Sequence, residues 1–137
     1  MALADIIIPK KTITVGESSF TVRALCADDV TRALYDAQSE VEQAVDLYKE
    51  VVNNPSDDAQ MNQFTASLLR TAPTLVARVI AYAADEPDQS AIVARLPLPV
   101  QTEAFYAVIE LTLVEPDSLK KFVGNITSII SKVNPTK

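Results

Sequence analysis

Three pairs of adjacent carboxylates are the residues best suited to chemistry, because acidic side chains that converge can hold a metal ion. They are Asp28-Asp29, Asp57-Asp58 and Asp85-Glu86. Each pair lies beside an expected helix boundary, where carboxylates are favoured as caps and by the helix dipole. Neighbours on a helix also point about 100° apart and converge poorly on one ion. We interpret the pairs as helix-boundary residues and expect no metal site.

Groups for acid–base or nucleophilic catalysis are sparse. The sequence has no histidine, so it lacks the commonest general base near neutral pH and the commonest metal ligand. The single cysteine, Cys26, precedes an expected helix start that could lower its pKa, but the adjacent Asp28 and Asp29 oppose that effect. We expect Cys26 to be buried and inert. The sequence predicts a protein that binds or builds, not an enzyme, and one without a cofactor.

Composition and charge narrow the class of protein further. The chain has 137 residues, 48% apolar and 22% charged, which fits one globular domain over residues 1–137. Its net charge of −6 disfavours nucleic-acid binding. The start, MALADIIIPKK, has no basic leader typical of a secretion signal. No window approaches the roughly 20 apolar residues of a membrane span. We expect a soluble cytoplasmic protein.

A β-hairpin is predicted over about residues 10–24. Apolar and polar residues alternate in KTITV and again in SFTVR, on either side of a turn containing Gly16. The alternation places Ile13, Val15, Phe20 and Val22 on one face. Because a lone two-stranded hairpin is not stable in water, helices must cover this face.

Helical periodicity dominates the rest of the chain, over about residues 28–133. It predicts helices at about 28–53, 57–71, 73–84 and 99–114, a short helix within SAIVARL, and a last helix with the stripe Leu119, Phe122, Val123, Ile126, Ile130 and Val133. The apolar segment PTLVARVIAYAA is interpreted as a central core helix. Tyr35, Tyr48, Tyr82 and Tyr106 are interpreted as half-buried packing residues. The predicted fold class is mainly α, with an N-terminal β-hairpin packed on a bundle of about five helices.

Two parts of the sequence resemble a known family. A hairpin, then RALCADDV, then a long helix resembles the start of tail assembly chaperones of long-tailed bacteriophages. The stretch RLPLPVQTEAFYAVIELTLVEPDSLKKFVGNITSII is similar to their LP-x-x-x-Q run, L-T-x-x-E turn and L-K-K-F-type helix. The region from Asn53 to Asp88 carries little of this likeness.

The resemblance implies a protein of the host bacterial cytoplasm that acts during virion assembly. Its implied partners are the tape measure protein, which it would bind and keep soluble, and tail tube subunits, which it would help to recruit. Many family members also have a longer form made by ribosomal frameshifting, for which this sequence carries no clear signature. Two other interpretations stay open: a virion structural adaptor of the head- or tail-completion type, and a small acidic immunity-type inhibitor.

Two apolar surfaces are candidates for partner binding. One is the proline connector, with Leu96, Leu98 and Val100, and the other is a partly alanine stripe on the long helix. From that stripe we select Leu34, Val41 and Tyr48. The alternative is that all six residues are core. The long helix and the edges of the hairpin, Thr12–Val15 or Phe20–Arg23, also permit a homo-oligomer.

Overall fold

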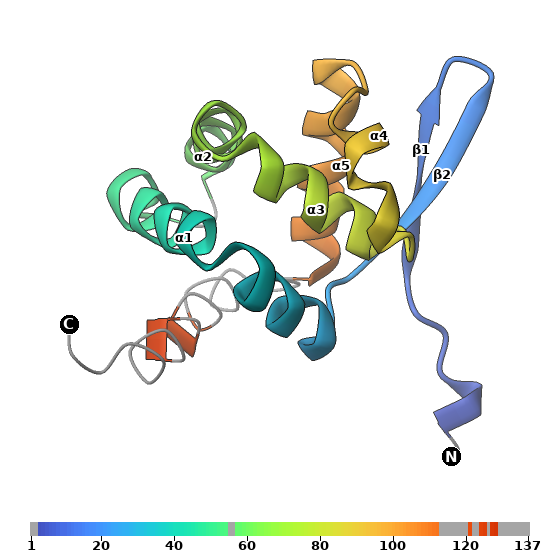
Figure 1. The fold of residues 1–137 in the computed structure, drawn as a ribbon, viewed down its shortest axis with the longest axis horizontal. Helices are drawn as coiled ribbons and strands as arrows, with labels where there is room; N and C mark the ends of the chain where they lie inside the picture. The colour runs from blue at the N-terminus through green and yellow to red at the C-terminus, as the bar shows by residue number, and fades with distance from the viewer. Residues whose placement is uncertain (1–2, 55–56, 113–120, 122–123, 126, 129–137) are drawn as a thin grey trace.

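The computed structural model describes residues 3–54, 57–112, 121, 124–125 and 127–128. Within them, an antiparallel hairpin precedes five α-helices, which confirms the predicted fold class (Figure 1). In chain order the elements are η1 (Leu3–Asp5), β1 (Lys10–Val15), β2 (Ser18–Arg23), α1 (Ala27–Val51), α2 (Asp58–Thr71), α3 (Pro73–Ala83), η2 (Pro87–Gln89), α4 (Ser90–Val93) and α5 (Leu98–Thr112). Most of the predicted last helix, including its stripe from Leu119 to Val133, lies outside the described residues.

The hairpin is held in register by its turn and by its apolar face. β1 and β2 pair with Ile13 opposite Phe20, and two residues connect them. Gly16 begins this turn with a φ of 62°, a conformation that glycine adopts without strain. Ile13 and Val22 are fully buried and Phe20 is partly buried.

Helices α5 and α3 cover the apolar face of the hairpin. Both strands contact α5, and β2 also contacts α3. The buried positions of α5 include the fully buried Ala104 and Ala107. The predicted docking of the hairpin on helices is therefore confirmed.

Helix α1 has two segments that meet at Ala37. There φ is −147° and ψ is 45°, so the predicted uninterrupted helix is wrong at this residue. The buried positions of α1 are Asp29, Ala33, Ala37, Val41, Val45 and Tyr48. Because an α-helix has 3.6 residues per turn, a spacing of four moves such a stripe around the helix by about 40° per step. The change of direction at Ala37 keeps both segments facing the core (Figure 1).

Helices α2 and α3 follow from clear start signals. The Asp57 carboxylate accepts hydrogen bonds from the N–H groups of Ala59 and Gln60, at 2.9 and 3.4 Å. Pro73 opens α3, where its missing N–H costs no helical hydrogen bond. Eight of the eleven residues of α3 are buried, which confirms the prediction of a central core helix.

The proline connector is shorter than the sequence suggests. Leu98 begins α5, so Leu98 and Val100 belong to the helix and not to the connector. The buried Gln101 holds the segment between α4 and α5 in place. Its Nε2 donates hydrogen bonds to the carbonyl oxygens of Ala94 and Leu96, at 3.2 and 2.9 Å.

The four tyrosines do not share one environment. Tyr48 and Tyr82 are buried and Tyr106 is partly buried, whereas the side chain of Tyr35 is 89% exposed. The prediction of a half-buried Tyr35 is therefore wrong. Tyr35 lies two positions after the buried Ala33, which turns it about 200° away from the core side of α1.

Candidate functional site: an apolar groove between four helices

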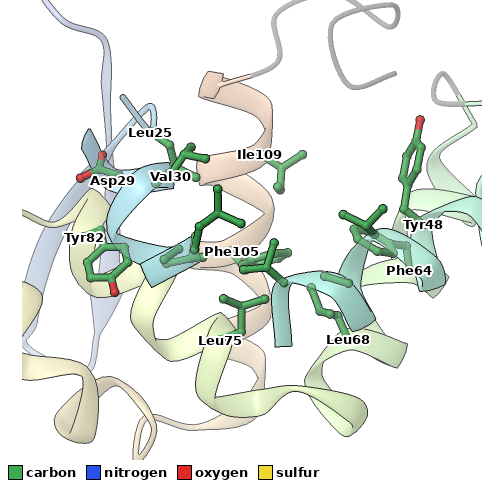
Figure 2. Close-up of a pocket in the computed structure, with 16 residues that line it drawn as sticks. Leu25, Asp29, Val30, Tyr48, Phe64, Leu68, Leu75, Tyr82, Phe105 and Ile109 are labelled. Carbon is green, nitrogen blue, oxygen red and sulfur yellow. The ribbon is translucent and has the colours of Figure 1, made fainter. Parts of the chain in front are cut away.

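A hollow of about 110 Å³ lies between α1, α2, α3 and α5. We call it the apolar groove, and its wall includes Leu34, Val41, Ala44, Tyr48, Phe64 and Ile109 (Figure 2). Among the described residues, no polar atom of the wall is exposed to the hollow. The few polar side chains in the wall, such as Tyr48, turn their oxygen atoms away from it (Figure 2). The groove can therefore offer an occupant van der Waals contact and burial but no hydrogen bond.

Both segments of α1 contribute to the groove. Val30 and Leu34 come from the segment before the break at Ala37, and Val41 and Ala44 come from the segment after it. A straight helix would present these residues on a steadily rotating stripe. The break is therefore part of what shapes the groove.

Two aromatic rings pack together where α1 and α2 meet in the groove wall. The rings of Tyr48 and Phe64 meet edge to face, with their centroids 5.8 Å apart and an angle of 84° between them. This geometry is favourable for aromatic pairs. Phe105 of α5 and Leu75 of α3 are buried in the floor, and Ile109 of α5 is half-buried at the rim.

The structure brings three of the six predicted partner-binding residues together. Leu34, Val41 and Tyr48 all line the groove; Leu34 is half-buried, and the other two are buried. These three remain predicted contacts.

The other three predicted residues lie elsewhere. Leu96 lines a different hollow, beside β2 and α4. Leu98 is 63% exposed and lines a shallow surface near Tyr106, while Val100 is half-buried against the core. The connector therefore does not form one surface with the α1 stripe.

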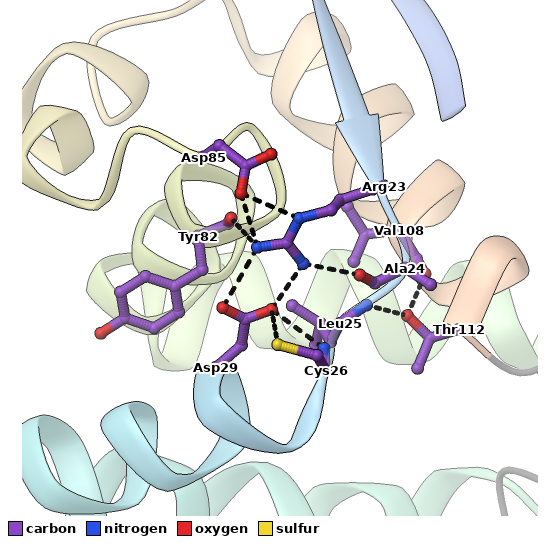
Figure 3. A network of polar contacts seen from close by, with 9 residues as sticks. All are labelled: Arg23, Ala24, Leu25, Cys26, Asp29, Tyr82, Asp85, Val108 and Thr112. Carbon is purple, nitrogen blue, oxygen red and sulfur yellow. Dashed lines mark hydrogen bonds and ion pairs between the residues drawn. The ribbon is translucent and has the colours of Figure 1, made fainter. Parts of the chain in front are cut away.

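A partly buried arginine fixes the first segment of α1 beside the groove. Arg23, at the end of β2, donates from Nη1 to Asp29 Oδ2 at 2.7 Å and from Nε to Asp85 Oδ1 at 2.9 Å. Its Nη2 donates to the carbonyl oxygen of Tyr82 at 3.0 Å (Figure 3). We call Arg23, Asp29, Asp85 and the Tyr82 carbonyl the arginine node. The node joins β2, the start of α1 and the end of α3.

Asp29 connects the node to the groove. It lines the groove, and its Oδ2 also accepts a hydrogen bond from the N–H of Cys26 at 2.9 Å. Burial alone would raise the pKa of Asp29, but hydrogen bonds from Arg23 and Cys26 outweigh it and hold the pKa below its ordinary value. The pKa of Arg23 is raised, first by its hydrogen bond to Asp29 and then by that to Asp85. Both charges persist at neutral pH, so the node is a positioning device for α1.

The acidic pairs take three different roles. Asp57 caps α2 and Asp29 braces the first turn of α1, which confirms the helix-start interpretation for these two pairs. The third pair also lies beside a helix boundary, but Asp85 follows the C-terminal end of α3, where the helix dipole disfavours a carboxylate. The capping and dipole explanation is therefore wrong for Asp85. Asp85 also has a positive φ of 60°, and its ion pair with Arg23 at 2.8 Å offsets both costs. Within the described ranges, no group of three or more acidic or cysteine side chains has the geometry to hold a metal ion.

Cys26 is exposed, so the prediction of a buried cysteine is wrong. It is the N-cap residue of α1, a position that lies outside the helix and near the surface. Its Sγ donates to Asp29 Oδ2 at 3.3 Å.

Sequence reasoning missed the groove residues contributed by helices other than α1. Helical periodicity identifies Phe64, Leu68 and Phe105 only as core residues, although all three line the groove. Periodicity shows which side of a helix is apolar. It does not show where two apolar stripes leave a gap between them, so no signal in the sequence identifies the groove.

Comparison with known protein families identifies the family of this chain. A family model described as Pre-tape measure protein matches residues 1–137, and the chain belongs to this family. The family connects the chain to phage tail assembly and to the tape measure protein. No curated protein and no solved structure matches the sequence significantly. None of the described helices has the length and apolar character needed to cross a bilayer.

Proposed function

We propose that this protein is a tail assembly chaperone that binds an apolar helical segment of the tape measure protein in the apolar groove and keeps it soluble. The observation that carries the proposal is the groove itself, whose wall exposes only apolar atoms. Membership of the pre-tape measure family supports the choice of partner.

The groove suits one face of an amphipathic helix. In the helix-in-groove mode, apolar side chains at i, i+3, i+4 and i+7 enter a cleft between helices. A tape measure chain exposes such stripes before the tail tube encloses it. The rim residues Val30, Leu34 and Ile109 are half-buried, so an incoming side chain can reach them.

The acidic surface supports solubility of the complex. The chain carries 18 acidic and 12 basic residues, and its net charge of −6 keeps copies from aggregating once they cover an apolar partner. Asp46 and Glu50 of α1 are exposed and contribute to this acidic surface.

Binding must also be reversible, because tail tube subunits replace the chaperone. A hollow of about 110 Å³ accommodates few side chains, so each contact is weak. Several copies along one tape measure chain would hold it through avidity. In this proposal the protein acts in the host bacterial cytoplasm, helps to recruit tail tube subunits and performs no catalysis.

The test is co-expression of the tape measure protein with full-length variants of this chain. Leu34→Glu places a charge in the groove wall and should weaken capture by at least about tenfold, since a buried leucine contributes roughly 1.5–3 kcal/mol. Tyr35→Glu is the matched control, because this neighbour on α1 is 89% exposed and lies outside the groove. It should capture and solubilise the tape measure protein as the wild type does.

A second variant separates loss of binding from loss of folding. Ala44→Phe fills the groove with apolar atoms, so the fold should persist while the partner is excluded. If Ala44→Phe is folded and still captures the tape measure protein, the groove is not the binding site. If purified virions contain the protein in stoichiometric amounts, the virion adaptor interpretation replaces the chaperone proposal.

A further inference from the structure

Residues 3–9 form an arm with four large apolar side chains exposed to solvent. Leu3 and Ile7 are 86% and 88% exposed, and Ile6 and Ile8 are 56% and 55% exposed. The arm consists of η1 and an extended stretch that ends at Pro9, just before β1. Soluble monomers rarely expose so dense an apolar run without a partner for it.

The same chain carries a hollow that suits such an arm. The β2 hollow, of about 190 Å³, lies between β2, the end of α3 and α4, and its apolar residues are Phe20, Ala81, Ala84, Ile92, Val93 and Leu96. Ile92 is 61% exposed, so the hollow is accessible. It is separate from the apolar groove, with which it shares no wall residue.

Charge favours the same pairing. Lys10 and Lys11 follow the arm directly, and both are exposed. Glu86 lines the β2 hollow, and the exposed Asp88 lies two residues further along. In a molecule with a net charge of −6, copies repel one another. A basic segment that meets an acidic rim reduces that repulsion at one place and sets the direction of approach.

The arm does not enter the hollow of its own copy. It leaves the hairpin at the end where Lys10 pairs with Arg23, whereas the hollow lies against Phe20, further along β2. Figure 1 shows the arm running away from α4 and from the helical body. The available hollow is therefore on another molecule.

We propose that the arm of one copy docks in the β2 hollow of a second copy, with its isoleucines against Ile92 and Leu96 and with Lys10 against Glu86. The two surfaces are different, so the contact is heterologous. Repetition then produces a ring or an open chain of copies. Such a chain would present apolar grooves in series, which suits a long partner, but self-association does not depend on that partner.

The test measures self-association of the purified full-length chain by sedimentation velocity over a wide concentration range. Ile7→Glu in the arm and Ile92→Glu in the hollow should each weaken association by at least about tenfold, because each removes one isoleucine from the contact. Both residues are exposed, so circular dichroism should show an unchanged fold. Tyr35→Glu is the control and should associate as the wild type does.

Mixing the two variants gives the sharper result. Ile92→Glu keeps an intact arm and Ile7→Glu keeps an intact hollow, so an equimolar mixture should form dimers and nothing larger. The charge pair gives a second check, since Lys10→Glu should weaken association and Glu86→Lys should restore it in the double variant.

Several outcomes would overturn the proposal. One is a wild-type protein that stays monomeric at all concentrations. Protection of the arm from hydrogen exchange in such a monomer would show that the arm occupies the hollow of its own copy. Another is an Ile92→Glu variant that associates normally while Ile7→Glu does not. A third is an Ile7→Glu variant that self-associates as the wild type does. Because no tape measure protein is present, each result is independent of the proposed chaperone function.

Discussion

The apolar groove and the arginine node lie at the two sides of the same short helical segment, and they are built in opposite ways. In the node, all three guanidinium nitrogens of Arg23 donate hydrogen bonds to carboxylate or carbonyl oxygens. In the groove, the wall offers apolar surface that no side chain among residues 3–54 and 57–112 fills. The difference indicates a division of labour. The node holds the start of α1 in place, and the groove, one of whose walls is that segment, is the surface to which we assign binding.

Removal of Arg23 should have the largest effect on stability. Arg23→Ala leaves the buried Asp29 carboxylate without its cation, and we expect a loss of about 3 kcal/mol in the free energy of unfolding. Urea denaturation measures this loss. Lys11→Ala is the control, because the ion pair of Lys11 with Glu110 is 3.8 Å long with both side chains about half exposed, and such pairs contribute less than about 1 kcal/mol. Equal losses from the two variants would contradict the role of the node.

Acid should weaken the node. A carboxyl whose pKa is lower in the folded than in the unfolded chain stabilises the fold above the unfolded pKa, about 3.9 for aspartate. That contribution is lost as the pH falls through the lower folded pKa. At neutral pH, Asp29→Asn should lower the free energy of unfolding by about 2 kcal/mol. Below about pH 4, the difference in stability between this variant and the wild type should shrink. A pH series of denaturation midpoints measures this. A difference that stays constant down to pH 2 would show that Asp29 acts through its shape and not its charge.

Filling the groove should separate stability from binding. Ala44→Phe adds apolar contact to a wall that lacks it, and cavity-filling changes often add about 0.5–2 kcal/mol. Thermal unfolding should show a midpoint equal to or above that of the wild type, while capture of the tape measure protein falls. A clear drop in the midpoint would mean that another part of the protein already fills the groove.

Substitution of the exposed Leu98 should have the smallest effect on stability and on capture of the tape measure protein. Leu98→Asp changes a side chain that is 63% exposed, so stability should change by no more than about 0.5 kcal/mol. Capture of the tape measure protein should fall less than with Leu34→Glu, since Leu98 lies outside the groove. Abolished capture with an intact fold would instead move the binding site to the connector.

Local sequence signals predicted most of the fold. The alternation around Gly16 specified the hairpin, and Pro73 with the apolar run after it specified the central helix. These features depend on neighbours in the chain. The break at Ala37 could not be predicted, because neither proline nor glycine is present there. Helix α1 contacts both α2 and α3, and such tertiary packing leaves no local signal in the sequence.

The candidate site was predicted only in part. Leu34, Val41 and Tyr48 were selected from the apolar stripe of one helix, and all three line the groove. Phe64 and Ile109 come from other helices, so their place in the groove depends on tertiary packing. The roles of Arg23 and Asp85 were missed for the same reason, because 62 residues separate them in the chain.

Hydrogen exchange of the full-length protein, with and without a peptide from an amphipathic helix of the tape measure protein, tests the central claim most directly. The account predicts that the peptide slows exchange in α1 and α5 around Leu34, Ala44 and Ile109, and that Ala44→Phe abolishes this protection. Protection confined to the arm or to the connector around Leu98, with the groove unchanged, would contradict it.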